Sequence, residues 1–345
     1  MLCGGTDSAA SDTIEWREQR LHYVICGSCG LKYMSPRPTQ GWYLRFYEHE
    51  FWQEKATFQG YSSKGAREAA AIDEGTAKRV AKQRRRALRI ADLLAPVVSL
   101  DSASLVIDVG TAFGETPALL RERHGCRVLG VEPSAHGRAY CAEVNGVELV
   151  GRYMEDLAER QPFDGEVDLV VMSHVLENIV DPRAALASAR RLLRPEGSLY
   201  LDTCNFYFNN AVNPYHPYVF SPETLTDLLA RCGFGLLAQY SETHPRQASW
   251  PTDPYLAVIA RPAVAATLTR PVDVERLVAD QQLGLSLLAE SKRRRRDYER
   301  SGEAAAGSAS AGAAGRSTSQ SSRGRTTPFR PPSQSPRADS DPPGS

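Results

Sequence analysis

The chain has 345 residues, enough for one large domain with additions. Its 41 basic residues balance 41 acidic ones, so no net field would draw it to nucleic acid or to a membrane surface. Because no apolar run reaches transmembrane length and no charged and then apolar leader opens the chain, we expect a cytoplasmic protein whose partner is a small molecule.

Three cysteines gather near the N-terminus. Cys26 and Cys29 form a C-x-x-C knuckle followed by glycine, and Cys3, also followed by glycine, resembles the second half of another knuckle. A structural zinc site usually has four ligands, and a fourth cysteine at the same spacing would lie before Met1, so we expect the start of the chain to cut the site; His22 is a substitute ligand. The alternatives are a redox motif, although the βαβ context of such motifs is absent, and three unligated thiols.

The N-terminal segment also carries a family resemblance. Residues 29–38 are similar to part of the small zinc-ribbon module that precedes the methyltransferase domain in many bacterial sugar and secondary-metabolite methyltransferases. The resemblance implies a truncated zinc-ribbon-like head over residues 1–40, with Cys3, Cys26 and Cys29 as ligands of a structural Zn²⁺. The other cysteines, which we expect to pack as small hydrophobic side chains, are Cys126, Cys141, Cys204 and Cys232.

Residues 41–99 are predicted to be a helical linker between the head and the core. An aromatic cluster at helical spacing is typical of a packed core, although helices at this place in similar enzymes often cover the acceptor pocket as a lid. From residue 66 to 94, a run of basic side chains without interleaved aromatics predicts a solvated helix face rather than a nucleic-acid contact. The cluster comprises Trp42, Tyr43, Phe46, Tyr47, Phe51 and Trp52, and the basic run comprises Lys78, Arg79, Lys82, Arg84, Arg85 and Arg86.

Residues 105–114 are the most informative segment. Their apolar start predicts a buried strand that ends near Asp108 and turns on glycines into a helix, and a second apolar stretch ends in Glu132. Glu132 follows Asp108 at close to the ~20-residue offset of a ribose-binding acid at the next strand end. The layout predicts an α/β crevice that binds a ligand with a ribose.

The spacing of the glycines argues against a pyrophosphate ligand. A dinucleotide fingerprint has a glycine or alanine three residues after its second glycine, and counting from Gly110 and Ala112 that position is Glu115. A carboxylate in the first helical turn would repel a phosphate at the helix N-terminus. The expected ligand is therefore a nucleoside without phosphates.

These segments resemble the first two motifs of the class I S-adenosylmethionine-dependent methyltransferases, carried by residues 108–114 and 131–134. The similarity covers residues 100–262, with residues 163–171 as the fourth strand, 173–178 after it and 192–197 as the turn into the fifth strand. It implies an α/β, Rossmann-like fold with a seven-stranded mixed sheet, helices on both faces and a final hairpin that makes one strand antiparallel. Ala112 departs from the pattern, because it replaces the middle glycine of the loop, and we expect it to keep a negative φ.

The resemblance assigns these segments to the methyl donor, S-adenosylmethionine. Asp108 would accept hydrogen bonds from loop amides or from the donor's ammonium group, the glycines would let the backbone approach its amino-acid end, and Glu132 would bind both ribose hydroxyls. After the third strand, Met154 and Glu155 would contact the adenine, unless the acids there only complement the dipole of a helix N-terminus. The full donor set is Asp108, Gly110, Thr111, Ala112, Phe113, Gly114, Glu132, Pro133, Met154, Glu155 and Ser173.

Two histidines are candidates for a catalytic base. Methyl transfer is an in-line displacement in which positioning supplies much of the rate, so a base is needed only for a protonated nucleophile. His174 follows the fourth strand, at the edge of the sheet where ligands bind, or else it is a structural or helix-capping histidine. His216 lies in a loop that resembles the Glu-His segment of sugar C-methyltransferases, with Tyr215 in place of the glutamate, or else it is a surface residue.

Beyond residue 262 the composition changes. Residues 263–300 are predicted to form an amphipathic basic helix, whose cations at residues 292–296 are expected to be solvated. Residues 301–345 contain mainly Ser, Ala, Gly, Pro and Arg, and a segment with so few large apolar side chains cannot offset its ordering entropy. We expect a disordered tail there.

These features predict an S-adenosylmethionine-dependent methyltransferase whose acceptor is a sugar nucleotide or a secondary metabolite, methylated at carbon or oxygen. One alternative is a quinone or polyketide O-methyltransferase, which an apolar rather than polar pocket above Glu177 and His216 would indicate. The other alternative is a degenerate donor-binding protein that interacts with partners and has no turnover. The sequence leaves the oligomeric state open.

Overall fold

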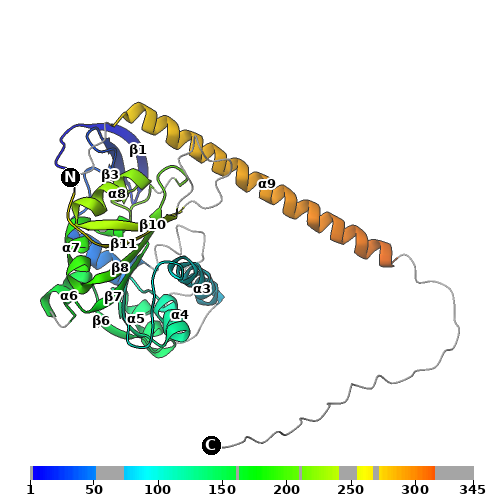
Figure 1. Ribbon diagram of the computed structural model, residues 1–345. Coiled ribbons are helices and arrows are strands. Elements are labelled where there is room, and N and C mark those ends of the chain that lie inside the picture. The colour runs from blue at the N-terminus through cyan, green and yellow to red at the C-terminus, as the bar shows by residue number, and fades with distance from the viewer. Residues whose placement is uncertain are drawn as a thin grey trace, which may run out of the picture. The chain divides into compact units, whose positions relative to one another are not determined.

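The computed structural model describes residues 3–51, 74–160, 163–209, 212–240, 255–266 and 272–314. The chain divides into two units, Met1–Arg293 and Arg294–Ser345, and all strands of the described ranges belong to the first (Figure 1). Trp52, residues 66–73 of the predicted basic run and residues 267–271 of the predicted C-terminal basic helix lie outside these ranges. Among the described helices, none combines the length and the apolar character needed to cross a membrane.

The larger sheet has the strand order β10-β11-β8-β7-β4-β5-β6. Its strands pair in parallel except for β11, which runs antiparallel to both of its neighbours and forms a hairpin with β10. This order confirms the predicted seven-stranded mixed sheet with one antiparallel strand. The strands are β4 (Leu105–Val109), β5 (Arg127–Val131), β6 (Glu148–Gly151), β7 (Val167–Ser173), β8 (Leu193–Cys204), β10 (Phe234–Tyr240) and β11 (Tyr255–Pro262).

Helices cover both faces of this sheet. Side chains of α6, α7 and α8 form one apolar cluster with the strands, and side chains of α3, α4 and α5 form another. Because neighbouring residues of β4 alternate between the clusters, with Ile107 in the first and Val106 in the second, the strand is buried on both faces and reads as an apolar run. The helices are α3 (Glu74–Leu94), α4 (Glu115–His124), α5 (Ala135–Glu143), α6 (Met154–Arg160), α7 (Pro182–Leu192) and α8 (Pro222–Arg231).

The N-terminal head is an antiparallel sheet of four strands in the order β1-β2-β3-β9. Three of its strands come from the predicted head, but β9 precedes α8 in the core, and there Lys32 pairs with Val219 and Tyr33 with Tyr218. The head therefore shares a sheet with the core. The strands are β1 (Ser8–Trp16), β2 (Gln19–Cys26), β3 (Lys32–Met34) and β9 (Tyr218–Val219).

The aromatic cluster lies on α1 (Gln40–Arg45) and the π-helical turn η1 (Phe46–Glu50). The ring of Phe46 stacks on Trp42 at 5.0 Å between centroids and on Tyr215 at 5.1 Å. These rings join the segment after the head to the loop before β9. The described part of the cluster is therefore packed, as helical spacing of aromatic residues predicts.

Helix α9 (Val274–Ala314) begins in the first unit. There Leu277 lies against Gly30 of the head, Asp280 is buried, and Gln281 Nε2 donates to the Phe206 carbonyl at 3.0 Å. The predicted boundary at residue 300 differs from the structure, in which the helix continues to Ala314. Residues 315–345 of the predicted tail lie outside the described ranges.

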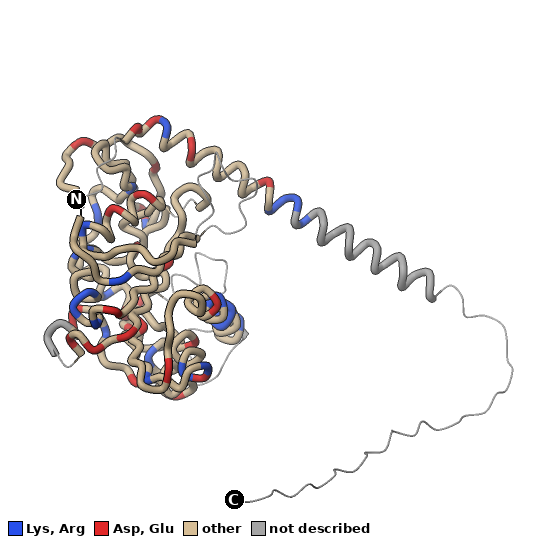
Figure 2. Tube along the Cα trace, viewed as in Figure 1, with Lys and Arg blue, Asp and Glu red and all other residues tan. Residues whose placement is uncertain are grey.

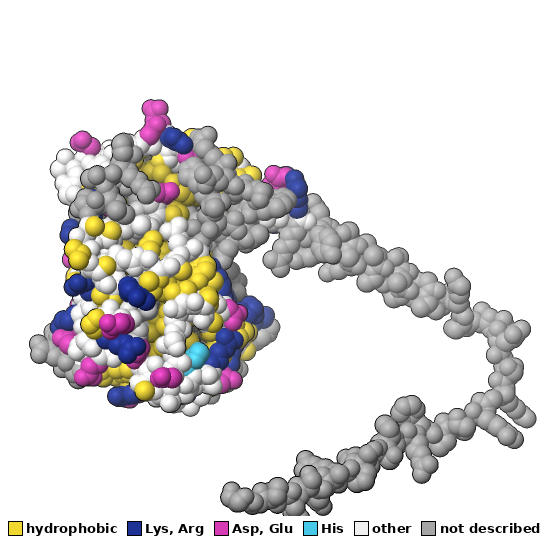
Figure 3. Space-filling view, viewed as in Figure 1, with side chains coloured by type: hydrophobic (Ala, Val, Ile, Leu, Met, Phe, Trp, Pro, Cys, Tyr) yellow, Lys and Arg dark blue, Asp and Glu magenta, His cyan; other side chains and the backbone are white. Residues whose placement is uncertain are grey.

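Charged side chains of both signs are interspersed over the first unit, in keeping with the balanced composition (Figures 2 and 3). Helix α3 differs, because its described part carries mainly cations.

Candidate functional site

A cavity of about 200 Å³ lies at the carboxyl ends of the parallel strands. One side of it comes from the turns after β4, β5, β6 and β7, the edge where an α/β sheet binds ligands. The other side comes from α1, η1, Phe51 and α3, which precede the sheet in the chain. The predicted donor residues in its lining are Gly110, Ala112, Glu132, Pro133, Met154, Glu155 and Ser173.

Backbone hydrogen bonds to β5 hold the turn after β4. The N–H groups of Gly110 and Thr111 donate to the Val131 carbonyl at 2.8 and 3.1 Å. Gly110 has a φ of +70°, and an added Cβ would lie 2.5 Å from the side chain of Val175. Both the backbone conformation and this close approach require glycine.

The expectation of a negative φ at Ala112 is wrong, because its φ is +52°. This left-handed conformation costs a residue with a Cβ about 1–2 kcal/mol. The N–H group of Ala112 donates to Glu132 Oε2 at 2.8 Å, and this charge-assisted hydrogen bond offsets the strain. The conformation thus depends on a partner in the next strand, which local sequence does not show.

Glu132 is buried in the wall of the cavity, at the end of β5. Its Oε2 accepts the bond from Ala112, and its Oε1 accepts a bond from the Ser134 N–H group at 2.9 Å. Burial raises the pKa of this carboxyl to about 7, although the two backbone hydrogen bonds act in the opposite direction. Each oxygen keeps a further acceptor site, so the fixed carboxylate suits a pair of ribose hydroxyls.

Asp108 lies beneath the loop rather than in the described lining of the cavity. Its pKa is raised to about 7, mainly by burial and in part by the charges of Glu132 and Asp202. The described lining of the cavity does not include Asp108, and its hydrogen bonds to loop amides or to the donor's ammonium group stay a prediction. The other predicted donor residues outside the described lining are Thr111, Phe113 and Gly114.

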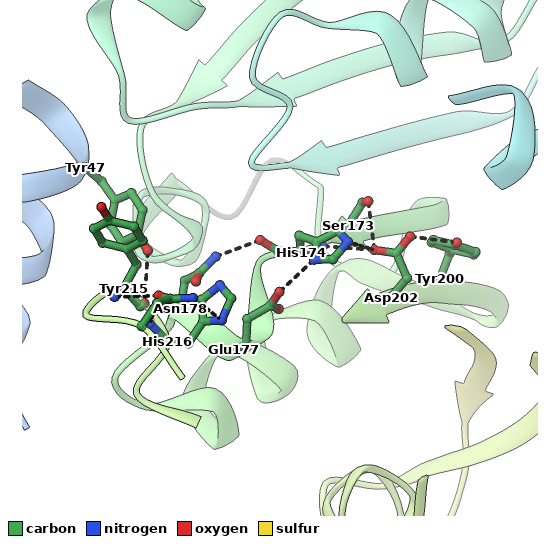
Figure 4. Close-up of polar contacts among 10 residues, drawn as sticks. Tyr47, Ser173, His174, Glu177, Asn178, Tyr200, Asp202, Tyr215 and His216 are labelled. Atoms are coloured by element: carbon green, nitrogen blue, oxygen red, sulfur yellow. Dashed lines mark hydrogen bonds and ion pairs between the residues drawn. The ribbon is translucent and has the colours of Figure 1, made fainter. Parts of the chain in front are cut away.

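His174 lies in the cavity wall directly after β7 (Figure 4). Its Nδ1 is 2.9 Å from Glu177 Oε1, and its backbone N–H donates to Asp202 Oδ1 at 3.0 Å. Asp202 is fixed in turn, because it accepts bonds from the Ser173 hydroxyl at 2.8 Å and the Tyr200 hydroxyl at 3.0 Å. His174 also has a φ of +54°, a strained conformation of the kind that clusters at functional sites.

Glu177 lies between His174 and His216, in the 3₁₀ turn η3 (Leu176–Asn178) (Figure 4). Burial raises its pKa, and the charge of His216 acts in the opposite direction. His216 is absent from the described lining of the cavity, and its Nδ1 lies 2.9 Å from Asn213 Nδ2. The structure therefore brings both predicted histidines to Glu177 but only His174 into the cavity wall.

The segment after the head is bound to the turn after β6 across the cavity. Gln40 Nε2 donates to Glu155 Oε1 at 3.1 Å, the Tyr153 hydroxyl donates to the Leu44 carbonyl at 3.0 Å, and Arg152 forms an ion pair with Glu48. Sequence reasoning identified Glu155 in this turn but missed Arg152 and Tyr153. The aromatic residues that this segment adds to the lining are Tyr43, Tyr47 and Phe51. Its function as a lid stays a prediction.

The basic helix α3 also reaches the cavity. Gln83 Oε1 accepts a bond from the Phe113 N–H group at 3.3 Å, and Arg86 is half-buried in the lining. The expectation of a wholly solvated basic face is therefore wrong at Arg86. No sequence signal separates it from the exposed Arg85, because which side of the helix faces the sheet is decided by packing.

The three N-terminal thiols lie together. The Sγ atoms of Cys3, Cys26 and Cys29 are within 4.8 Å of one another, and those of Cys3 and Cys26 are 3.5 Å apart. The expectation that His22 is a substitute ligand is wrong. Its exposed ring forms a hydrogen bond with Thr13 Oγ1 at 3.0 Å, and His22 lies outside the group of thiols. The pKa of Cys26 is lowered, because backbone N–H groups of the turn outweigh the effect of burial. The pKa of Cys29 is raised by burial.

Comparison with known proteins gives a family match to residues 80–239, described as "Methyltransferase domain". The chain is 32% identical over 106 residues to a ubiquinone biosynthesis O-methyltransferase of Pseudomonas paraeruginosa, covering 29% of this chain and 44% of that protein. It is 31% identical over 103 residues to a human thiol S-methyltransferase, covering 28% of this chain and 39% of that protein. The chain thus matches less than half the length of these curated relatives.

Among solved structures, a 1,6-didemethyltoxoflavin-N1-methyltransferase of Burkholderia thailandensis, with S-adenosylhomocysteine bound, aligns with a TM-score of 0.46 at 16% identity. The alignment covers 73% of this chain and all of that one.

Proposed function

We propose that this protein is an S-adenosylmethionine-dependent methyltransferase, which the family match to residues 80–239 and the seven-stranded sheet support. We further propose that it methylates a hydroxyl group on a small molecule with an apolar or aromatic body. One arrangement carries the proposal. The glycine loop and Glu132 form one wall of the cavity, and His174, bonded to Glu177, stands in the same lining. A donor site and a proton acceptor thus share one space.

The choice of acceptor rests on the lining after β7 and under α1. The side chains there are mainly apolar or aromatic, and this favours a quinone-like or polyketide-like acceptor over a sugar nucleotide. The similarity to ubiquinone biosynthesis O-methyltransferases supports the same class. The residues concerned are Tyr43, Leu44, Tyr47, Phe51, Val175, Ile179 and Val180.

The mechanism follows from the residues around the cavity. When bound, S-adenosylmethionine supplies an electrophilic methyl group on a sulfonium centre. Glu132 holds the ribose hydroxyls, and Met154 and Glu155 line the place proposed for the adenine. With Glu177 ionised and accepting the Nδ1–H of His174, Nε2 is the ring nitrogen that would accept a proton, and it lies 3.9 Å from Asp202 Oδ1.

His174 Nε2 would accept the proton of the acceptor hydroxyl, whose oxygen would then be nucleophilic toward the methyl group that the bound donor would supply. The carboxylate of Glu177 stabilises the imidazolium that results, as a buried acid does beside a catalytic histidine. His216 lies behind Glu177 and tunes that carboxylate rather than the acceptor. Only a protonated nucleophile needs this arrangement, and a hydroxyl is the group that fits it.

Calorimetric titration with S-adenosylmethionine, S-adenosylhomocysteine and NAD tests the donor site. We expect micromolar binding of the two sulfur nucleosides and none of NAD. Binding of NAD alone would contradict the interpretation of the glycine loop. Donor binding without turnover on any catechol, phenol or sugar-nucleotide acceptor would instead favour the donor-binding protein without catalysis.

We also propose that Cys3, Cys26 and Cys29 hold a structural Zn²⁺. Zn–S bonds of about 2.3 Å in a tetrahedron place sulfur atoms nearly 4 Å apart, and the spread of the three Sγ atoms fits three such corners. No fourth His, Cys, Asp or Glu of the described chain joins the group. The ion would link Cys3 to the turn between β2 and β3 and so stabilise the head.

Metal analysis of the purified protein tests the zinc proposal. We expect close to one zinc per chain, loss of the metal in Cys26→Ser, and a lower melting temperature in that variant. Cys126→Ser, at a buried cysteine far from the group in sequence, is the matched control and should keep the metal. A wild-type protein that contains no zinc after expression with added zinc would refute the site.

A further inference from the structure

Helix α3 places the cation Arg86 in the lining of the cavity, and the exposed Lys82 precedes it by one turn. Lys82 and Arg86 are four residues apart and so lie on one face of the helix. Arg86 is half-buried and lines the cavity. Neither side chain has a hydrogen bond or an ion pair with any residue that the structure describes. A half-buried guanidinium without a partner is unusual, because charges removed from water are normally paired.

The charges next to Lys82 on the described helix have the same sign as its own. The pKa of Lys82 is lowered, first by burial and then by the charges of Arg86 and Arg85. Like charges that crowd one another in this way are stabilised by an anion placed between them. Lys82 is exposed to solvent, whereas Arg86 is half-buried in the lining of the cavity.

The neighbours of Arg86 relate it to the part of the cavity near His174. Arg86 lines the cavity, and its charge acts to lower the pKa of Glu177 and of Tyr200. The side chains of Glu177 and Cys204 lie within 4.8 Å of His174, which we propose as the base. An anionic group at Arg86 would therefore belong to the molecule whose hydroxyl faces His174.

We infer that Arg86, assisted by Lys82, binds the carboxylate of the acceptor, and that the acceptor is an aromatic hydroxy acid. The inference rests on the proposed function and narrows its substrate class. A planar guanidinium matches a carboxylate with two parallel hydrogen bonds. A phosphate fits less well, because its greater charge would lie near the buried carboxyl of Glu177. The rings of Tyr43, Tyr47 and Phe51 would cover the aromatic body.

Two probes that differ only in charge test the inference: 3,4-dihydroxybenzoate and its neutral amide, 3,4-dihydroxybenzamide. Each is titrated calorimetrically into the protein saturated with S-adenosylhomocysteine. We expect the wild-type protein to bind the acid at least about tenfold more tightly than the amide, as a charge-assisted pair provides. Arg86→Gln should remove this preference, and Arg85→Gln, which deletes an exposed charge from the neighbouring position, should keep it.

A second pair of ligands shows whether Arg86 binds the carboxylate of the acceptor or that of the donor. S-adenosylhomocysteine carries a carboxylate, whereas 5′-methylthioadenosine lacks the amino-acid group. If Arg86→Gln weakens the binding of S-adenosylhomocysteine but not that of 5′-methylthioadenosine, the guanidinium binds the donor and the inference is wrong. It is equally wrong if the wild-type protein binds acid and amide alike, or neither of them.

The outcomes also distinguish this inference from the proposed function. Intact binding of S-adenosylhomocysteine without a preference for the acid overturns only the carboxylate site at Arg86. Failure of the wild-type protein to bind S-adenosylhomocysteine overturns the proposed function, and the acceptor site with it.

Discussion

The two halves of the cavity are assembled in different ways. The half that we propose for the donor, the donor half, comes from successive turns after β4, β5 and β6, in which Glu132 accepts bonds from Ala112 and Ser134. The half that we propose for the acceptor, the acceptor half, combines α1, η1 and α3 with the turn after β7, segments far apart in the chain. The first half is preorganised by local bonds, whereas the second depends on how the preceding helices pack over the sheet. Acceptor preference can therefore change while the donor site stays intact.

The halves also differ in charge. Buried carboxyls, Asp108 and Glu132, lie in and beneath the donor half, where a cationic sulfonium is expected. His174 and the cation Arg86 face the acceptor half. This polarity orients the two proposed substrates, because each charge meets its opposite only in one arrangement.

The strongest test of the division of the cavity into a donor half and an acceptor half is the variant His174→Ala. If His174 is the base, turnover on a hydroxylated acceptor should fall about 10²- to 10⁴-fold, while calorimetry shows unchanged affinity for S-adenosylhomocysteine. His216→Ala is the matched control, because His216 also approaches Glu177 but stays outside the described lining. It should lose less than about tenfold. A larger loss in His216→Ala than in His174→Ala would reverse the assignment.

The donor half is tested by Glu132→Ala. The variant loses the proposed bonds to the ribose and releases the N–H groups of Ala112 and Ser134. With about 1.5 kcal/mol for each of two charge-assisted hydrogen bonds, the affinity for S-adenosylhomocysteine should fall by about 3 kcal/mol. Glu143→Ala, on the exposed side of α5, is the control and should bind as the wild type does. Equal affinities in all three proteins would remove Glu132 from the site.

The same contrast explains which parts of the site the sequence predicts. Residues 105–114 and Glu132 form a local pattern in which a strand, a glycine turn and an acid follow one another, and the structure has them as expected. His174 could be predicted for the same reason, because the end of a parallel strand marks the ligand edge of the sheet. The alternation of strands and helices predicts a parallel α/β sheet, whereas the seven-stranded mixed sheet is implied by the family resemblance.

What the sequence does not reveal depends on contacts between distant segments. The positive φ of Ala112 is supported by a side chain from the next strand, and the place of Arg86 is decided by which face of α3 packs on the sheet. His216 is near Glu177 but outside the described lining of the cavity, a difference that only the path of its loop determines. Strand β9, with two residues, is too short to give a periodic signal, yet it completes the sheet of the head.

The buried carboxyls predict opposite pH trends for stability and donor binding. A carboxyl whose folded pKa is raised to about 7 binds its proton more tightly when folded, so stability is greatest below the unfolded pKa and falls as the pH rises from about 4 toward 7. Ribose binding needs the ionised form of Glu132, so affinity for S-adenosylhomocysteine should rise about tenfold from pH 6 to pH 8.

Glu132→Gln provides the control for this prediction, because the amide does not titrate. Calorimetry across the pH range should show a flatter affinity profile in the variant than in the wild type, and thermal melts should show a smaller decline in stability. Parallel profiles in the two proteins would mean that Glu132 does not carry the pH dependence.

The smallest expected effect concerns the strained residue of the donor half. Ala112→Gly relieves a left-handed conformation that costs a residue with a Cβ about 1–2 kcal/mol, while glycine adds up to about 1 kcal/mol of unfolded-state entropy. The net result should be a gain of up to about 1 kcal/mol in the free energy of unfolding by urea titration. Ala118→Gly, inside α4, lacks the strain and should lose about 1 kcal/mol. If both variants lose stability equally, Ala112 is not strained, and the hydrogen bond to Glu132 cannot be the contact that compensates for it.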